Sequence, residues 1–397
     1  MMSCQLYQGY YCLMERVLEV KTRGEELVAT FPGVPPGFEV VLCPLAAHTF
    51  QMQGGPADGA TAVFQTNDAG QVTAVLVGGE YELTRLDGPP PASSYPTGQG
   101  LLAPQWTLDA AKQTAFSELL AEIVGVGDGR LLEYQLPYPK HEFLQYVAAQ
   151  EVVIFHGSGE PGIDEFLTRR TSLELNDKSG RGNVQGIYGT HDGLWPLFFA
   201  IVDRPKITGS IRNGFSTFRN KQGDEIRVYD FSINKDWLDK APWRTGTLYF
   251  LPRDTFRRMP LTAAGGLSNE WVSESPLKPL ARLAIEPEDF PFFHQIGGHD
   301  DSELLQLATW QDEVLTAVTT ATFSPETIHM KLAYTGELGP RLLDFMALSQ
   351  KYFPTATYTV RFQPGGEVWY DFSGPPAAMQ VMKDRLAEKV GPLESNA

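Results

Sequence analysis

The chain has 397 residues, of which 42% are hydrophobic and 20% are charged, so it is long enough for two or three domains with buried cores. Its formal net charge of −16 means that the chain as a whole would repel nucleic acid. Its three cysteines, Cys4, Cys12 and Cys43, are too few to form a disulfide framework.

No stretch approaches the roughly 18 consecutive apolar residues that a membrane helix needs. The first twenty residues include Glu15, Arg16 and Glu19, and they lack the basic start and continuous apolar centre of a signal peptide. Cys43 and His48 have no second pair of residues at metal-ligand spacing. We therefore expect a cytoplasmic protein with no metal site and no membrane partner.

Residues 1–87 have the pattern of a small all-β domain. Apolar and polar residues alternate at 18–21 and 26–31, and strand-like residues at 72–77 follow a turn at 68–70. This spacing predicts an antiparallel β-barrel or sandwich. The segment resembles the small β-domain appended to serine β-lactamase-like proteins, but no hydrolase core is visible and no hydrolase activity is implied. The motifs that carry this resemblance are Gly9-Tyr10-Tyr11, Leu18-Glu19-Val20, Pro35-Pro36, Cys43-Pro44-Leu45, Phe50 and Asp68-Ala69-Gly70-Gln71-Val72.

Two further domains are expected after a proline-rich linker at residues 88–105. The first, at 106–300, would begin with an amphipathic helix over 108–124 that Thr107 caps. The second, at 301–397, would be an α+β domain of unknown role. Its segments 322–348 and 361–386 repeat the order strand, strand, helix, and two such ββα units would share one sheet with helices on a single face.

The stretch from 203 to 258 is locally basic, with twelve lysines and arginines against seven acidic residues. Such a segment in an acidic chain is suited to the phosphates of a dinucleotide or to a nucleic-acid substrate. It is equally well explained as a solvated face whose charges are balanced by acidic residues elsewhere.

Three short blocks in the middle of the chain carry specific chemistry. An apolar run at 151–155 predicts a buried strand, which stops at the sequence His156-Gly157-Ser158-Gly159. Residues 185–190 predict a second short strand containing Tyr188 and Thr190, followed by a buried helix over 192–202. Residues 269–273 predict a third strand in which Glu270 lies beside apolar residues, where a carboxylate needs a partner.

The order and spacing of these blocks resemble the ADP-ribosyltransferase superfamily, in the branch with a His–Tyr–Glu triad that diphtheria-type toxins and poly(ADP-ribose) polymerases share. An expected strand at 246–252 also fits that fold. The resemblance implies an α+β architecture whose central domain is a split β-sheet that binds NAD+ without a metal. It implies three catalytic residues, His156, Tyr188 and Glu270.

The resemblance also implies a role for each residue. His156 would hydrogen-bond the adenosine-side ribose, the Gly157 backbone would hold the nicotinamide carboxamide, and Tyr188 would stack on the nicotinamide ring. Glu270 would accept a hydrogen bond from a hydroxyl of the nicotinamide ribose. The neighbouring side chains that would also face the dinucleotide are Ser158 and Thr190.

The implied activity is transfer of ADP-ribose from NAD+ to a protein or nucleic-acid acceptor, as in a toxin or phage-defence effector. The sequence departs from the pattern of the arginine-specific members of the superfamily, which use a Gln-x-Glu or Glu-x-Glu pair to engage the acceptor. Here Ser268 precedes Glu270 by two positions, and Val272 precedes Glu274 by two. A simple arginine acceptor is therefore in doubt, and Glu274 stays an alternative to Glu270. Two other functions remain open, an NAD+ glycohydrolase and a catalytically inactive nucleotide-binding or interaction protein.

Overall fold

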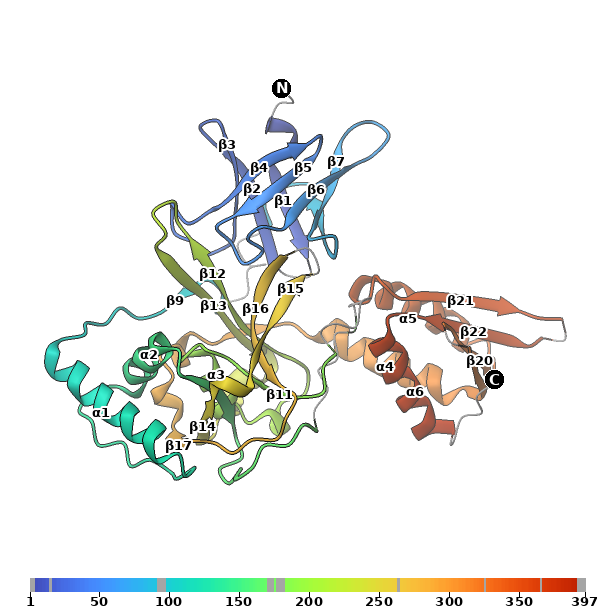
Figure 1. Ribbon diagram of the computed structural model, residues 1–397. Coiled ribbons are helices and arrows are strands. Elements are labelled where there is room, and N and C mark those ends of the chain that lie inside the picture. The colour runs from blue at the N-terminus through green and yellow to red at the C-terminus, as the bar shows by residue number, and fades with distance from the viewer. Residues whose placement is uncertain are drawn as a thin grey trace. The chain divides into compact units, whose positions relative to one another are not determined.

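The computed structural model describes residues 4–13, 16–90, 98–169, 175, 183–262, 265–324, 326–364 and 366–390. The chain divides into two units. Unit 1 comprises Met1–Arg169 and Gly186–His299, and unit 2 comprises Arg170–Gln185 and Asp300–Ala397. The protein is a mixed α/β protein with several sheets (Figure 1).

The N-terminal part of unit 1 is a closed antiparallel β-barrel, which confirms the predicted all-β domain (Figure 1). Each strand pairs with the next in sequence, and the first strand pairs with the eighth to close the barrel. Alternate residues point inward, as with the buried Phe50 and Met52. The strands are β1 (Gly9–Leu13), β2 (Arg16–Arg23), β3 (Glu26–Thr30), β4 (Val40–Ala46), β5 (Thr49–Gln53), β6 (Thr61–Thr66), β7 (Val72–Val77) and β8 (Tyr81–Leu86).

Two helices come next in the chain, α1 (Ala110–Val126) and α2 (Lys140–Gln150). The prediction that Thr107 caps the first helix is wrong. The carboxylate of Asp109 accepts a hydrogen bond from the backbone N–H of Lys112 at 2.8 Å, so the helix begins two residues later than predicted. Leu108 is accordingly 44% exposed instead of facing the core.

Three sheets make up the rest of unit 1. The first has the order β10-β14-β17, the second β11-β16-β15, and the third β12-β13-β18 with β9 also paired to β13. The two-residue strand β9 lies within the stretch expected as linker, whose residues 91–97 lie outside the described residues. The strands are β9 (Leu101–Leu102), β10 (Val153–Ser158), β11 (Ile187–Gly189), β12 (Ile211–Arg219), β13 (Glu225–Asn234), β14 (Gly246–Pro252), β15 (Arg257–Thr262), β16 (Gly265–Ser273), β17 (Ala281–Ile285) and β18 (Gly297–His299).

Helix α3 (Trp195–Ile201) packs against β10 and forms the centre of the main hydrophobic core of unit 1. Pro196 lies in its first turn, where its missing N–H costs no hydrogen bond. Leu197, Phe198 and Ile201 are fully buried. Val153 and Phe155 of β10 belong to the same core, which fixes the strand that leads to His156.

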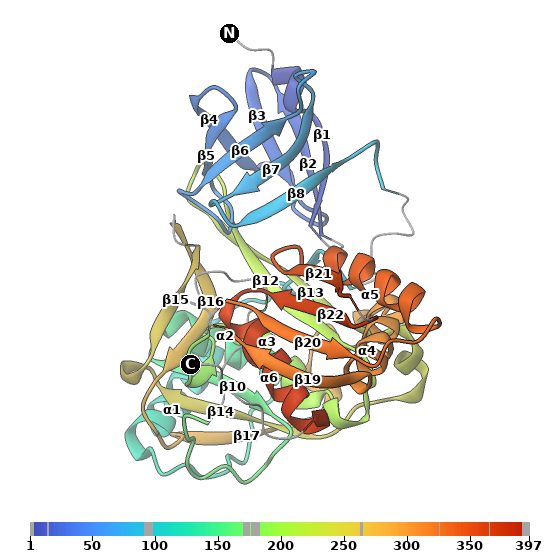
Figure 2. The same cartoon turned by 90° about the vertical axis from the view of Figure 1, so that its right-hand side faces the viewer.

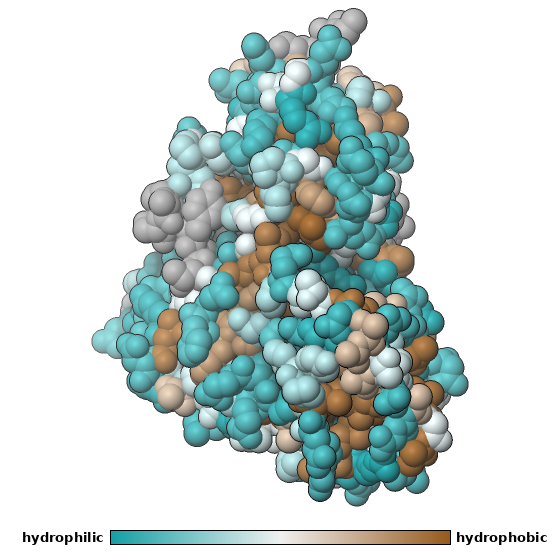
Figure 3. All heavy atoms as spheres, turned by 90° about the vertical axis from the view of Figure 1, so that its left-hand side faces the viewer, coloured by the Kyte–Doolittle hydropathy of each residue, from teal (hydrophilic) through white to brown (hydrophobic). Residues whose placement is uncertain are grey.

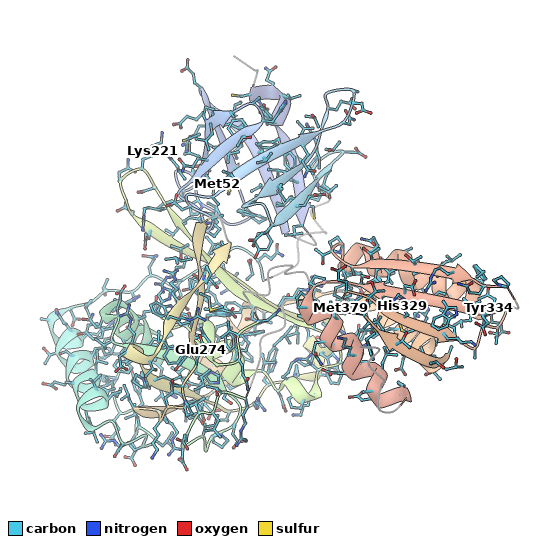
Figure 4. All side chains as sticks on the ribbon, turned by 45° about the vertical axis from the view of Figure 1, so that its right-hand side comes forward. Met52, Lys221, Glu274, His329, Tyr334 and Met379 are labelled. Atoms are coloured by element: carbon cyan, nitrogen blue, oxygen red, sulfur yellow. The ribbon has the colours of Figure 1, made fainter. Side chains whose placement is uncertain are left out.

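The tip of the β12–β13 hairpin belongs to the barrel core. Phe218 and Val228 are buried in the same cluster as the inward-facing residues of the barrel. The backbone N–H of Arg219 donates to the carbonyl of Gly54 at 2.7 Å, and the ammonium of Lys221 lies 2.6 Å from Glu26 (Figure 4). The hairpin therefore links the barrel to the sheets that hold the candidate site.

Unit 2 is a single sheet of order β19-β20-β22-β21 with three helices (Figure 2). Its core contains residues of all three helices and alternate residues of the strands, so the helices cover one face of the sheet. The other face carries half-exposed polar residues such as His329, which hydrogen-bonds Asp371 at 2.8 Å. The elements are α4 (Ser302–Thr316), β19 (Val318–Phe323), β20 (Ile328–Leu332), α5 (Leu338–Tyr352), β21 (Thr357–Phe362), β22 (Val368–Ser373) and α6 (Pro376–Val390).

The surface of the protein mixes hydrophilic and hydrophobic residues, as the face in Figure 3 shows. Val124, Val126 and Leu131, at the end of α1 and just beyond it, are among the large hydrophobic residues that are more than 40% exposed. Among the described residues, no helix is both long enough and apolar enough to cross a membrane.

Candidate functional site

His156 lies on β10, which extends three residues beyond the predicted strand and includes the His-Gly-Ser sequence. Its ring packs edge-on against Phe166 at 5.0 Å and against Tyr249 at 6.4 Å. Its Nδ1 lies 2.7 Å from the carbonyl oxygen of Tyr188. Because a carbonyl can only accept, Nδ1 must donate in this hydrogen bond, and in the neutral imidazole Nε2 is then the acceptor. This is the tautomer that can receive a hydrogen bond from a sugar hydroxyl.

Tyr188 and Glu270 lie on neighbouring strands of one sheet. In the antiparallel pair β11–β16, Tyr188 is directly opposite Val272. Because side chains alternate along a strand, Tyr188, Val272 and Glu270 share one face, and Tyr188 and Glu270 are diagonal neighbours at about 7–8 Å. Glu270 is partly buried, and its backbone N–H donates to the hydroxyl of Ser268 at 3.1 Å.

The three predicted residues are therefore brought into one region of unit 1. Strand β11 connects them, because its residue Tyr188 is bonded to His156 through its carbonyl and shares a sheet face with Glu270. Thr190, just after β11, also joins this segment to β10. Its N–H donates to the carbonyl of Phe155 at 3.0 Å, and its carbonyl accepts from the N–H of Phe155 at 2.8 Å.

Glu274 is in a different environment from Glu270. It lies just after β16, is exposed, and forms an ion pair with Arg257 at 2.7 Å (Figure 4). Both side chains of that pair are more than half exposed, so solvent screens the interaction. Glu274 is thus in solvent, whereas Glu270 is partly buried.

Position 157 has no room for a side chain, whether or not a ligand binds there. A Cβ at this position would lie 1.8 Å from the carbonyl oxygen of Pro196 and 3.2 Å from the backbone nitrogen of Ala200. The strand thus passes directly against α3, and only glycine allows that approach.

We expect Gly157→Ala to lower the free energy of unfolding by about 1–3 kcal/mol, because helix and strand must separate to admit the methyl group. Gly162→Ala is the matched control, because Gly162 lies five residues further along the chain and a Cβ there would meet only the side-chain oxygen of Glu160, at 4.0 Å. Urea unfolding of both variants measures the difference. Equal stability of the two variants would contradict the packing argument.

Ser158 and Thr190 use their hydroxyls locally. The hydroxyl of Ser158 accepts a hydrogen bond from the backbone N–H of Glu160 at 3.1 Å, and that of Thr190 accepts one from Asp192 at 3.2 Å. Thr190 is only 3% exposed. Their contribution to a binding site would therefore be to shape the backbone on either side of His156 and Tyr188.

The sequence did not reveal the polar network behind these strands. Asp192 is fully buried, and its Oδ1 accepts hydrogen bonds from the backbone N–H groups of Leu194 and Trp195 at the start of α3. Its Oδ2 accepts one from Arg227 at 2.6 Å and one from the Tyr229 hydroxyl at 2.8 Å. Burial raises the pKa of Tyr229 well above its ordinary value. In the sequence, the only signal for this network is an aspartate just before an apolar helix. Its side-chain partners, Arg227 and Tyr229, lie more than thirty residues further along the chain.

Among the described residues, no three histidine, cysteine, aspartate or glutamate side chains are grouped so that they could hold a metal ion. No known family model and no curated protein matches this sequence. The geometry of the site itself must therefore carry the functional argument.

Proposed function

We propose that unit 1 binds NAD+ at His156, Tyr188 and Glu270, cleaves the bond between nicotinamide and ribose, and transfers ADP-ribose to a macromolecule. One observation carries the proposal. The residues singled out by the ADP-ribosyltransferase resemblance, which are 114 positions apart at the extremes, lie on strands that pair or hydrogen-bond with one another through β11.

The chemistry of the reaction fits a single carboxylate. Loss of nicotinamide leaves positive charge on the ribose, as in the oxocarbenium-like transition state of glycoside hydrolysis. A fixed, partly buried carboxylate stabilises that charge more strongly than a solvated one, because the local dielectric constant is lower. Glu270 is partly buried, whereas Glu274 is exposed, so we assign this role to Glu270.

The other two residues bind and orient the dinucleotide. The flat ring of Tyr188, on the same face as Glu270, is suited to stack on the nicotinamide ring. His156 presents Nε2 as an acceptor for a ribose hydroxyl, since Nδ1 is engaged by the Tyr188 carbonyl. The Gly157 backbone would hold the nicotinamide carboxamide, and Ser158 and Thr190 would shape the backbone beside it.

Two alternatives share NAD+ binding with this proposal and differ in the fate of the bound dinucleotide. If water is the acceptor, the protein is an NAD+ glycohydrolase, and if the bond is never broken, it is a nucleotide-binding protein. The absence of a Gln-x-Glu or Glu-x-Glu pair makes a simple arginine acceptor less suitable, but both protein and nucleic-acid acceptors remain within the proposal.

To identify the acceptor of ADP-ribose, the full chain is incubated with NAD+ labelled on its adenine and with either total cell protein or total RNA. The position of the label is then measured. The proposal predicts label in one of the two macromolecular fractions. Label found only in free ADP-ribose would establish the glycohydrolase instead. If NAD+ binds but all of the label stays in NAD+, the protein is a nucleotide-binding protein that does not break the bond.

A further inference from the structure

Three arginines gather around His191 and Trp271, and we call Arg227, Arg253 and Arg258 the arginine cluster. They come from separate elements, namely β13, the short 3-10 helix Arg253–Thr255 that comes after β14, and β15. All three positive charges act on His191, whose pKa is lowered to about 4 by its burial first and by these arginines in addition.

Aromatic rings hold the cluster in place. The indole N–H of Trp271 donates to Nδ1 of His191 at 3.1 Å, and the guanidinium of Arg253 lies 4.9 Å from the centre of the Trp271 ring. The ring of Phe215 also lies 6.1 Å from the ring of His191, and the guanidinium of Arg227 lies 5.5 Å from the centre of the Phe215 ring. Both arginines therefore lie over rings that contact one histidine.

Arg258 completes the cluster from the neighbouring strand. It is directly opposite Trp271 in the β15–β16 pair, and its Nε donates to the carbonyl of Ser268 at 2.7 Å. Burial lowers the pKa of Arg258, and the positive charge of Arg227 lowers it further. The two guanidinium groups therefore repel each other across a partly desolvated space.

The acidic residues near the cluster do not balance it. Asp192 pairs with Arg227 at 2.6 Å, but it is fully buried and both of its oxygens are already engaged. Glu151 lies 3.9 Å from Arg253 and is 71% exposed, so it screens little. Nε of Arg253 is buried and has no hydrogen-bond partner among the described residues. Glu225 also acts on Arg258, but it is about half exposed and is already paired with Arg219. Three cations held in a partly desolvated space with a single buried carboxylate are stabilised when an anion binds.

We propose that the arginine cluster binds a doubly charged phosphate group. The planar guanidinium fork matches phosphate oxygens in geometry, and a dianion balances the excess charge where a single carboxylate would not. The side chains of Arg227 and Arg253 are 33% and 40% exposed, so a ligand can reach them from solvent. The locally basic segment of the sequence thereby acquires a specific role for three of its arginines.

This site is separate from the proposed NAD+ site. Glu270 and Trp271 are consecutive in β16, so their side chains lie on opposite faces of the strand. The inference consequently does not depend on NAD+ cleavage. The phosphate could be free in solution or the end of a nucleotide, and the two sources are separated by comparing inorganic phosphate with ADP.

The test is calorimetric titration of the full chain with inorganic phosphate and then with ADP, using acetate as the singly charged control. Arg253→Gln and Arg258→Gln should each weaken phosphate binding about tenfold or more, because each removes charge-assisted hydrogen bonds. Arg257→Gln is the matched control, because Arg257 is adjacent in sequence, points to the opposite face, and pairs with Glu274 in solvent.

Tighter binding of ADP than of phosphate, if Arg258→Gln weakens it, would identify a nucleotide as the ligand of the cluster, and equal binding would identify the free ion. ADP binding that Arg258→Gln leaves unchanged belongs to another site. Arg258→Lys, which keeps the charge but not the fork, should fall between wild type and Arg258→Gln. Unfolding midpoints without phosphate show that the variants are folded. The proposal is overturned if the wild type binds neither ligand at millimolar concentration, or if Arg257→Gln loses as much affinity as Arg258→Gln.

Discussion

Replacing Glu270 by glutamine is expected to slow nicotinamide release from NAD+ by about 10²- to 10³-fold. The amide has nearly the same shape as the carboxylate, but it cannot stabilise the positive charge that develops on the ribose. The affinity for NAD+ itself should change little, because the charge appears only in the transition state. Initial rates at saturating NAD+, together with a binding titration, measure both quantities.

Glu274→Gln is the matched control for this experiment. Glu274 lies four residues further along the chain, is exposed, and pairs with Arg257 in solvent. We expect its variant to keep the wild-type rate within about twofold, since an exposed ion pair contributes little. A reversed result, in which Glu274→Gln is inactive and Glu270→Gln is active, would show that the wrong glutamate has been assigned.

Replacing Asp192 by alanine should have the largest effect on stability, lowering the free energy of unfolding by about 3–5 kcal/mol. The substitution leaves the partly buried guanidinium of Arg227 without its carboxylate, and it removes the acceptor for two backbone N–H groups at the start of α3. It also removes the carboxylate to which the buried hydroxyl of Tyr229 donates.

Asp164→Ala is the control for Asp192→Ala, because it removes the same type of side chain from an ion pair with Arg282 in which the aspartate is 86% exposed. Its expected cost is below about 1 kcal/mol. Urea unfolding of the two variants gives the comparison. A cost for Asp192→Ala as small as that for Asp164→Ala would mean that the buried network does not stabilise unit 1.

Local patterns predicted the elements that hold the candidate residues. Period-two alternation with glycine turns indicated barrel strands. Strands were also predicted at 151–155, 185–190 and 269–273, and these overlap β10, β11 and β16, although β10 ends three residues later and β16 begins four residues earlier than predicted. The helix over 108–124 was found but began at Ala110, because Asp109 and Thr107 are both suitable caps and only the contacts of the folded chain distinguish them.

Contacts between distant residues could not be predicted in the same way. Nothing local in the sequence shows that Arg227, Arg253 and Arg258 surround one histidine, because the pairing of Arg258 with Trp271 and the stacking of Arg253 on that ring depend on how the sheets form. The short strand β9 is a similar case. Its two leucines lie in a stretch rich in glycine and proline, and only pairing with β13 makes them a strand.

The central claim is that this protein breaks the bond between nicotinamide and ribose in NAD+. Its most direct test is to incubate the purified full chain with NAD+ and to measure free nicotinamide over time by chromatography. We predict release that is proportional to protein concentration and well above the spontaneous rate. Absence of release from a folded protein that binds NAD+ would contradict the claim.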